Sequence, residues 1–207
     1  MHFIITAGGT REYIDPVRFI SNASSGKMGF ALARAALKAG HKVTLISART
    51  AQRAPSGARV VEVESAAEMF EAVKKHFSKC DCLIMAAAVS DYAPIKQAKT
   101  KIKRSGKSLT IRLKPTADIL KWAGAHKKRN QIVVGFALED RKLREQAEKK
   151  LKEKNLDMII ANRVAAICAE ASAVEIKGRD CGWLRVEKAS KDAVAKYIIG
   201  RIERPSI

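Results

Sequence analysis

The sequence predicts an α/β fold in which a mostly parallel sheet lies between two layers of helices. Short apolar runs of strand length alternate with segments of helical periodicity along most of the 207 residues. Residues 82–89 are continuously apolar, as expected for a strand buried on both faces in the middle of a parallel sheet. The length suits one domain with a full core, so we expect a single domain over residues 1–207.

The expected elements are placed by their composition and by signals at their ends. Residues 26–39 are rich in alanine and are followed by Gly40, which is typical of the end of a helix. Ser65 and Glu68 form a capping box before apolar residues at helical spacing. The remaining expected elements are strands over 3–7, 43–47, 82–89, 132–136 and 156–161, a charged helix over 141–154, a terminal hairpin that pairs 174–177 with 183–186, and a last helix that begins at Ser190. This order predicts a Rossmann-like, three-layer arrangement, which binds ligands beyond the carboxyl ends of its strands.

The alternation of strands and helices breaks after residue 92. Residues 93–108 are mostly polar and basic, and Gly106 lies between the short runs 102–104 and 109–113. Glycine between two such runs is typical of a turn. We therefore expect a flexible flap over about 93–108 that leads into a short hairpin with its turn at Gly106.

The chain is strongly basic, with 40 lysines and arginines against 21 aspartates and glutamates, which gives a formal net charge of +19. Such a charge attracts polyanions. A nucleic-acid role would need exposed aromatic residues among the basic ones, and aromatic residues make up only 5% of the chain. We therefore favour small phosphate-bearing ligands. A basic RNA-binding α/β domain remains an alternative, and it predicts binding that weakens steeply with salt and no turnover.

The sequence indicates neither a membrane span nor export. No stretch approaches the roughly 20 apolar residues that a span needs, and the first residues lack the basic start of a signal peptide. The four cysteines, at positions 80, 82, 168 and 181, are then expected to be reduced thiols rather than disulfides. These observations favour a cytoplasmic protein.

Two glycine-containing loops have the composition of phosphate-binding sites. Glycine lets backbone N–H groups approach an anion, and the start of a helix adds unpaired donors and a favourable dipole. Neither loop is specific, because the Gly-x-Gly-x-x-Gly fingerprint is absent and Lys27 is followed by Met28 rather than by serine or threonine. A tight turn and close helix packing are the alternative roles of these glycines. The candidate residues are Gly8, Gly9 and Thr10 after the first strand, and Ser25 and Gly26 before the first helix.

One segment is individually recognisable. Residues 15–29 resemble the phosphopantothenoylcysteine synthetase family through the run DPVRFISNASSGKMG. Further segments continue the resemblance in order and spacing, and although each is weak alone, their shared register is specific. These segments are 86–92, 101–104, 117–120, 134–139 and 154–157.

The resemblance implies a ligase of coenzyme A biosynthesis. In this family the carboxylate of 4′-phosphopantothenate attacks the α-phosphate of a nucleotide and releases pyrophosphate. The amine of L-cysteine then attacks the acyl-nucleotide and forms 4′-phosphopantothenoyl-L-cysteine. We expect CTP rather than ATP as the co-substrate, and therefore an acyl-CMP intermediate.

The resemblance also implies a metal ion and partners. Mg²⁺ is expected to be held mainly by the phosphates of the nucleotide, and a homodimer is expected to complete each site. In many bacteria this domain follows a flavin-dependent decarboxylase, which is missing from this sequence. We therefore expect a free-standing synthetase, with a decarboxylase as a separate partner.

The matched motifs assign roles to individual residues. Asn22 is implied to hold the acyl-nucleotide, since its amide both donates and accepts hydrogen bonds. Lys101 is implied to fold over the site with the flap and to assist the second step. The other implied nucleotide contacts are Asp91, Ala117, Asp118, Ile119, Leu120, Phe136, Lys150 and Lys154, and the implied substrate contacts are Arg18, Asn22, Ala87 and Ala88.

Plainer roles remain open for several of these residues. Asn22 could cap a helix, Asp91 a turn, and Phe136 could belong to the core. Lys101 could belong to a solvated charge cluster, and Arg18 to a structural ion pair.

The chain departs from the family pattern in three places. Ala23 occupies a position usually filled by a larger polar or basic residue, and Ala117 replaces a common proline; both changes affect loop stiffness more than chemistry. Residues 170–174 lack the expected asparagine-containing pattern.

An NAD(P)-dependent oxidoreductase is the alternative enzyme. Such an enzyme would need a Tyr-x-x-x-Lys pair. We disfavour this alternative on the expectation that none of Tyr13, Tyr92 and Tyr197 has a lysine at that spacing.

Overall fold

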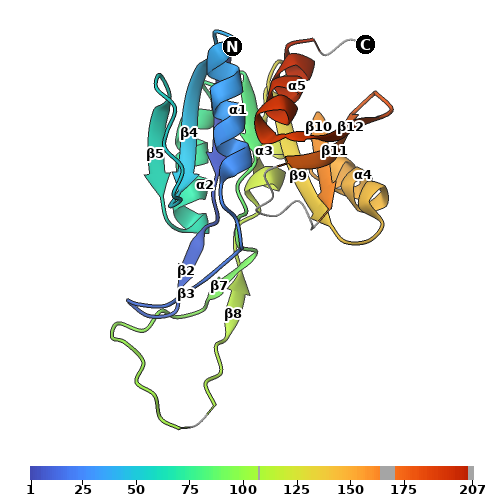
Figure 1. The fold of residues 1–207 in the computed structure, drawn as a ribbon. Helices are drawn as coiled ribbons and strands as arrows, with labels where there is room; N and C mark the ends of the chain where they lie inside the picture. Colours follow the sequence, from blue (N-terminus) through green and yellow to red (C-terminus); the bar gives the residue numbers. More distant parts are fainter. Residues whose placement is uncertain (107, 164–170, 205–207) are drawn as a thin grey trace.

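The structure is a computed structural model that describes residues 1–106, 108–163 and 171–204. Its centre is an eight-stranded sheet with the strand order β12-β11-β10-β9-β6-β1-β4-β5 (Figure 1). The strands from β10 to β5 in this order run parallel, whereas β11 and β12 are antiparallel at one edge. The strands are β1 (His2–Ala7), β4 (Lys42–Ala48), β5 (Arg59–Val63), β6 (Cys82–Met85), β9 (Ile132–Glu139), β10 (Met158–Arg163), β11 (Ala171–Gly178) and β12 (Trp183–Ser190).

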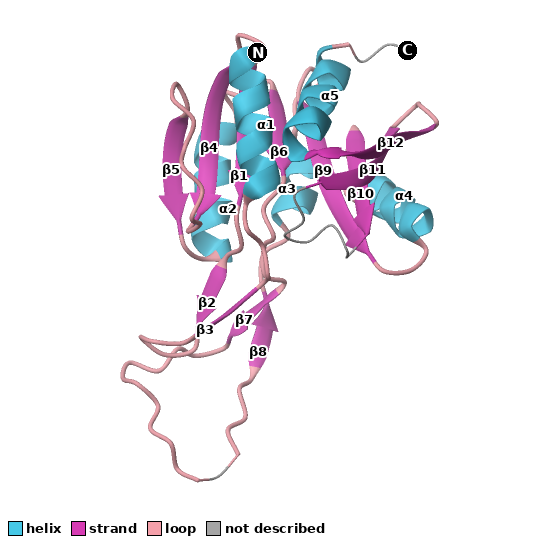
Figure 2. Ribbon diagram, in the orientation of Figure 1, coloured by secondary structure: helices cyan, strands magenta, loops and turns pink. Residues whose placement is uncertain are grey.

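Helices cover both faces of this sheet (Figure 2). Two helices pack on one face and three on the other. Successive residues of β1 point to opposite layers, because Phe3 and Ile5 belong to one core and Ile4 to the other. The predicted three-layer, mostly parallel α/β fold is therefore confirmed. The first face carries α1 (Lys27–Lys38) and α5 (Lys191–Glu203), and the second carries α2 (Ala66–Phe77), α3 (Ile119–His126) and α4 (Leu143–Glu153).

The order of the strands reverses at β1. The chain places β4 and β5 on one side of β1 and then returns to place β6, β9 and β10 on the other. Open sheets of this kind bind ligands at such a point, beyond the carboxyl ends of the strands. The loops after β1 and β6 meet there, because the N–H of Ala88 donates to Gly8 O at 2.8 Å and the N–H of Thr10 donates to Ala88 O at 3.3 Å.

Two short hairpins carry the chain away from the sheet (Figure 1). β2 (Arg11–Tyr13) pairs with β3 (Phe19–Ser21), and β7 (Tyr92–Pro94) pairs with β8 (Leu113–Pro115). Residues 95–106 and 108–112, which lie between β7 and β8, are called the flap below.

One buried carboxylate ties the flap to the first hairpin. Asp15 accepts the N–H of Ile102 at 3.1 Å and two hydrogen bonds from the Arg18 guanidinium at 3.0 and 2.5 Å. The Arg18 guanidinium also donates to Ile102 O at 2.8 Å. These bonds hold the pKa of Asp15 well below its ordinary value, and the Arg18 guanidinium is the largest cause.

The helix signals in the sequence are confirmed. Ser65 Oγ accepts the N–H of Glu68 at 3.2 Å at the start of α2. Ser190 Oγ accepts the N–H of Ala193 at 3.2 Å at the start of α5. The remaining expected strands, the charged helix and the terminal hairpin are present, with bounds that differ by a few residues.

The prediction of one strand over 82–89 is wrong in its second half. β6 ends at Met85, after which the N–H of Ala87 donates to Thr6 Oγ1 at 3.1 Å instead of continuing the ladder with β9. The run stays apolar because Ala86 and Ala87 pack against the two cores. The apolar pattern of residues 82–89 therefore predicted their burial better than their strand conformation.

The hairpin with its turn at Gly106 is also wrong as predicted. Among the described residues of that region, only 113–115 form a strand, which pairs with residues 92–94. Ile102 instead makes its backbone hydrogen bonds with Asp15 and Arg18. The sequence pattern predicted none of five elements that are short or begin without an apolar pattern: α3, β2, β3, β5 and β7.

Candidate nucleotide and substrate site

A cavity of about 350 Å³ opens beyond the carboxyl ends of β6 and β9. α3 and α4 contribute to its walls. Because its lining comes from segments that lie far apart in the sequence, the fold itself assembles this cavity. It brings together the predicted contacts Ala87, Asp91, Ala117, Asp118, Ile119, Leu120, Phe136, Lys150 and Lys154.

The N-terminus of α3 is part of the cavity wall. Asp118 is the N-cap of this helix, and its carboxylate accepts the N–H of Lys121 at 2.9 Å. Lys154 Nζ lies 2.8 Å from the other oxygen of Asp118. Burial by itself would raise the pKa of Asp118, but the hydrogen bonds from Lys154 and from the Lys121 N–H hold it below the ordinary value. Asp118 is therefore ionised at neutral pH and positions Lys154.

Lys150 enters the same cavity from α4. Its Nζ donates to Phe136 O at 2.7 Å. Burial lowers the pKa of Lys150, and the neighbouring Lys154 lowers it further. An ammonium group that has lost part of its hydration gains more from a nearby anion than an exposed one does. The two lysines thus bring two basic groups to the cavity wall, and their contact with a phosphate stays a prediction.

Asn22 lies against the loop that follows β6. Its Nδ2 donates to Ala88 O at 3.3 Å and to Val89 O at 3.1 Å. It does not cap α1, because the N-cap of that helix is Gly26. Asn22 is therefore fixed on the loop that carries Ala87 and Asp91 to the cavity.

Both glycine-containing loops pack against the side chain of Thr50, which follows β4. Gly8 and Gly26 have φ values of 83° and 74°, which favour glycine. A Cβ added to either would lie within 2.9 Å of Thr50 Cγ2. Thr10 is buried, and its Oγ1 accepts the N–H of Ser90 at 2.9 Å. Gly8, Gly26 and Thr10 therefore have packing roles. A nucleotide role for Gly8, Gly9, Thr10, Ser25 and Gly26 stays a prediction.

Lys101 and Arg18 are not part of the cavity within one chain. Lys101 is exposed on the flap, which extends away from the sheet (Figure 1). Arg18 is paired with Asp15 at the base of the flap. The cavity lining therefore contains nine of the predicted contacts. Lys101 and Arg18 lie outside it, as do Asn22, Ala88 and the residues of the glycine-containing loops.

Asn162 is a candidate site residue that the sequence analysis missed. It lies near the end of β10, and its Oδ1 is buried and has no hydrogen-bond partner within the described residues. Ser172 Oγ, near the start of β11, is also buried and has no hydrogen-bond partner within the described residues. A buried polar atom without a partner is rare and needs a physical explanation, such as a bound water, an ion or a catalytic role. Only the position at a strand end could have indicated Asn162 from the sequence.

No metal cage is visible in the ranges that the structure describes. Within them, no group of three or more histidine, cysteine, aspartate or glutamate side chains is placed to hold a metal ion. None of the described helices is long and apolar enough to cross a membrane.

Cys80 and Cys82 are free thiols. Cys80 and Cys82 are buried, and burial raises the pKa of Cys80 to about 12. Cys181 is partly exposed, and Cys168 lies outside the described residues. The two buried thiols are held in the un-ionised, unreactive form at neutral pH.

The expectation that no tyrosine has the Tyr-x-x-x-Lys spacing is wrong. Tyr92 and Lys96 have that spacing. They lie in β7 and in the flap, and no helix joins them to place both side chains on one face. The pair is thus not built like an oxidoreductase site.

The fold and the cavity define a Rossmann-like α/β protein with a lysine-lined cavity at the carboxyl end of its sheet. Residues 1–205 match the family described as "DNA/pantothenate metabolism flavoprotein C-terminal domain". The chain belongs to this family, and its resemblance to the phosphopantothenoylcysteine synthetases is confirmed.

Individual relatives agree with this assignment. The chain is 49% identical over 166 residues to the coenzyme A biosynthesis bifunctional protein CoaBC of Bacillus subtilis, covering 80% of this chain and 41% of that protein. It is 45% identical over 203 residues to a cysteine/cysteine sulfinic acid decarboxylase of an unknown prokaryote, covering 96% and 56%. The crystal structure of the C-terminal domain of a CoaBC protein has 40% identity and a TM-score of 0.86, covering 98% of this chain and 93% of that one. The chain thus spans about half the length of these two curated relatives.

Proposed function

We propose that the protein is a ligase that joins 4′-phosphopantothenate and L-cysteine through an acyl-nucleotide. One observation carries this proposal: the cavity between α3 and α4 places Lys150 and Lys154 with Asp91, next to the loop that Asn22 binds. Relatives named for coenzyme A biosynthesis support the choice of substrates. CTP, an acyl-CMP intermediate, Mg²⁺ and a homodimer belong to the proposal.

The first step activates a carboxylate. A carboxylate oxygen of 4′-phosphopantothenate bonds to the α-phosphorus, and the bond from that phosphorus to the bridging oxygen breaks, so pyrophosphate leaves. Lys150 and Lys154 lie where they would neutralise the charge that accumulates on the phosphates. Mg²⁺ bound to the nucleotide supplies further neutralisation.

The second step forms the amide. The cysteine nitrogen bonds to the acyl carbon, the bond from that carbon to the phosphate oxygen breaks, and the nucleoside monophosphate leaves as the amine loses a proton. Asn22, whose Nδ2 is held by two backbone carbonyls, positions the acyl group. Lys101 assists this step by stabilising charge on the leaving phosphate.

A homodimer would supply Lys101 and Arg18 to the cavity. Both residues lie away from the cavity of their own chain, on the flap and at its base. The flap and its hairpins also expose apolar side chains, among them Val17, Ile95 and Leu109, which are 58%, 51% and 55% exposed. An exposed apolar surface of this kind fits a protein interface. We infer that the flap of one copy covers the site of the other.

Pyrophosphate release tests the proposal. The purified protein is supplied with 4′-phosphopantothenate, L-cysteine, Mg²⁺ and each of CTP, ATP, GTP and UTP in turn. We expect release with CTP in excess of the other three, and amide product only when cysteine is present. A protein that releases no pyrophosphate with any nucleotide is not this ligase, and faster release with ATP would overturn the choice of CTP.

A further inference from the structure

Thr10 connects two segments on which the proposed ligase depends. It is fully buried and follows the turn after β1. Its N–H donates to Ala88 O at 3.3 Å, its Oγ1 accepts the N–H of Ser90 at 2.9 Å, and its O accepts the Ser21 hydroxyl at 2.7 Å. Thr10 is therefore bonded both to the loop after β6 and to the hairpin strand that leads into Asn22.

The planarity of one peptide group transmits the contact of the Thr10 hydroxyl to Asn22. The N–H of Ser90 and the carbonyl of Val89 belong to the same planar group, so a bond that fixes the first also fixes the direction of the second. Val89 O accepts Asn22 Nδ2 at 3.1 Å. Thr10 Oγ1 thus orients the carbonyl that in turn orients the Asn22 amide.

Thr10 also holds the main chain beside Asn22. Ser21 directly precedes Asn22, and the Ser21 hydroxyl donates to Thr10 O. Asn22 is therefore held by Thr10 from two directions, through its backbone neighbour and through the carbonyl that its side chain binds.

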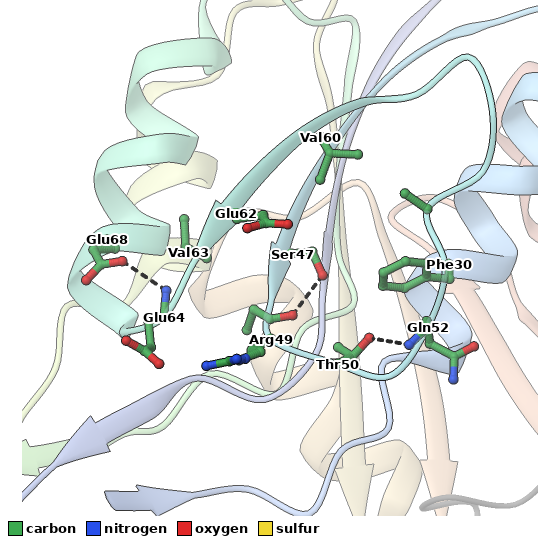
Figure 3. A pocket seen from close by; sticks show the side chains of 12 residues that line it. Phe30, Ser47, Arg49, Thr50, Gln52, Val60, Glu62, Val63, Glu64 and Glu68 are labelled. Atoms are coloured by element: carbon green, nitrogen blue, oxygen red, sulfur yellow. Dashed lines mark hydrogen bonds between the residues drawn. The ribbon is translucent and has the colours of Figure 1, made fainter. Parts of the chain in front are cut away.

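The corner between β5 and α2 anchors the start of the first hairpin. The N–H of Arg11 donates to Glu64 O at 2.8 Å, and Glu12 Oε1 accepts the N–H of Ala66 at 2.9 Å. The corner is itself fixed, because Glu68 accepts the N–H of Glu64 at 2.9 Å (Figure 3). Glu64 and Glu68 also line a second cavity, of about 600 Å³, at the carboxyl ends of β4 and β5. The residues that follow the turn after β1 are thus tied to two packed elements.

Thr116 holds the other side of the loop after β6. Its Oγ1 donates to Ser90 O at 2.7 Å, its N–H donates to Asp91 O at 2.9 Å, and it lines the cavity between α3 and α4. Asp91 therefore keeps its own anchor when the bond between Thr10 and Ser90 is lost. A change of the Thr10 side chain should disturb Asn22 and leave the cavity between α3 and α4 in place.

We propose that Thr10 is a positioning residue that orients Asn22 for amide formation. Thr10 acts through the peptide group between Val89 and Ser90 and through the hydroxyl of Ser21, rather than by a ligand contact of its own. This inference rests on the proposed ligase function, in which Asn22 positions the acyl group.

Single-turnover rates of the two half-reactions test this role. Thr10→Val keeps the shape of the side chain and removes the acceptor, whereas Thr10→Ser keeps the hydroxyl. We expect Thr10→Val to slow amide formation by about tenfold or more, because a buried hydrogen bond is lost and the acyl group is misplaced. The KM for CTP and pyrophosphate release without cysteine should change by less than about threefold, and Thr10→Ser should restore most of the rate of amide formation.

Thr44→Val is the matched control. Thr44 is also buried, and its Oγ1 is bonded to His2 Nε2 at 2.9 Å, but it lies near the amino end of β4. This variant loses a comparable hydrogen bond, and both of its half-reactions should stay within about twofold of the unaltered chain.

Ser21→Ala provides a second measurement at an exposed residue, so it decides the question even if Thr10→Val does not fold. It removes the hydroxyl that donates to Thr10 O, and it should slow amide formation by about threefold or more while pyrophosphate release stays within about twofold. Amide formation at the unaltered rate in Ser21→Ala would overturn the inference. Equal slowing of both half-reactions in Thr10→Val, or a Thr10→Ser variant as slow as Thr10→Val, would also overturn it. Absence of pyrophosphate release in the unaltered chain would instead contradict the ligase function itself.

Discussion

The cavity between α3 and α4 and the flap differ in how the chain holds them. The cavity residues lie at the ends of strands and helices that are packed into two cores, and Lys150 and Lys154 are each bonded to a neighbouring element. The flap is a long loop that is tied to the first hairpin mainly through Asp15. A rigid cavity keeps one shape and can bind a nucleotide without rearranging. A loop of this kind can open to admit substrate and close to exclude water. The comparison predicts that the cavity serves binding and the flap serves the second chemical step.

The largest expected effect falls on the flap. Lys101→Gln should slow amide formation by about 100-fold, since it removes a charged donor used in the transition state, while pyrophosphate release without cysteine changes by less than about threefold. Single-turnover measurements with rapid quenching give the two rates separately. Lys103→Gln, two residues away on the same loop, is the matched control. Equal losses in both steps would show that Lys101 does not have the assigned role.

A smaller effect is expected in the cavity. Lys150→Met should raise the KM for the nucleotide by about tenfold, because it removes a half-buried cation and leaves Phe136 O without its donor. The KM for cysteine should change little. Lys149→Met, on the exposed face of the same helix, is the control. If both variants behave alike, the cavity between α3 and α4 is not the nucleotide site.

Asp15→Asn should loosen the connection between the flap and the first hairpin. We expect the unfolding free energy to fall by about 1–3 kcal/mol, because charged hydrogen bonds to Arg18 and to the Ile102 N–H are weakened. Amide formation should slow more than pyrophosphate release. Urea unfolding and the two rates measure these effects, and a variant with slower pyrophosphate release but normal amide formation would contradict the division between cavity and flap.

The same substitution has a defined pH dependence. The Arg18 guanidinium keeps the pKa of Asp15 well below its ordinary value of about 4. The stabilisation from this carboxylate is therefore complete above about pH 5 and is lost as the pH falls through 4 toward the pKa in the folded state. The difference in unfolding free energy between the unaltered chain and Asp15→Asn should be constant above pH 5 and shrink below pH 4. A difference that grows on acidification would mean that Asp15 is not stabilised as an anion.

The same two regions show how far the sequence alone could lead. Regular periodicity and caps such as Ser65 predicted the sheet and most helices, because these signals act within one segment. Matched motifs predicted the cavity residues, and the fold then placed them together. The hairpin predicted around Gly106 was wrong, because the partner of Ile102 is Asp15, 87 residues earlier, and no local pattern encodes such a contact.

Two other features depended on contacts between distant segments. The end of β6 at Met85 follows from the hydrogen bond between the Ala87 N–H and Thr6, which apolar composition does not reveal. The cavity at the carboxyl ends of β4 and β5 needs these two strands side by side before Arg49 and Glu62 can both line it. Neither could be predicted from one sequence, because each is a property of strand pairing.

Oxygen transfer from substrate to nucleotide tests the central claim most directly. The protein is incubated with CTP, Mg²⁺, L-cysteine and 4′-phosphopantothenate that carries ¹⁸O in both carboxylate oxygens. The masses of the products are then measured by mass spectrometry. The account predicts one ¹⁸O atom in the nucleoside monophosphate, one in the amide product and none in pyrophosphate. Nucleoside monophosphate without label, or inorganic phosphate that carries it, would contradict activation of the carboxylate at the α-phosphate.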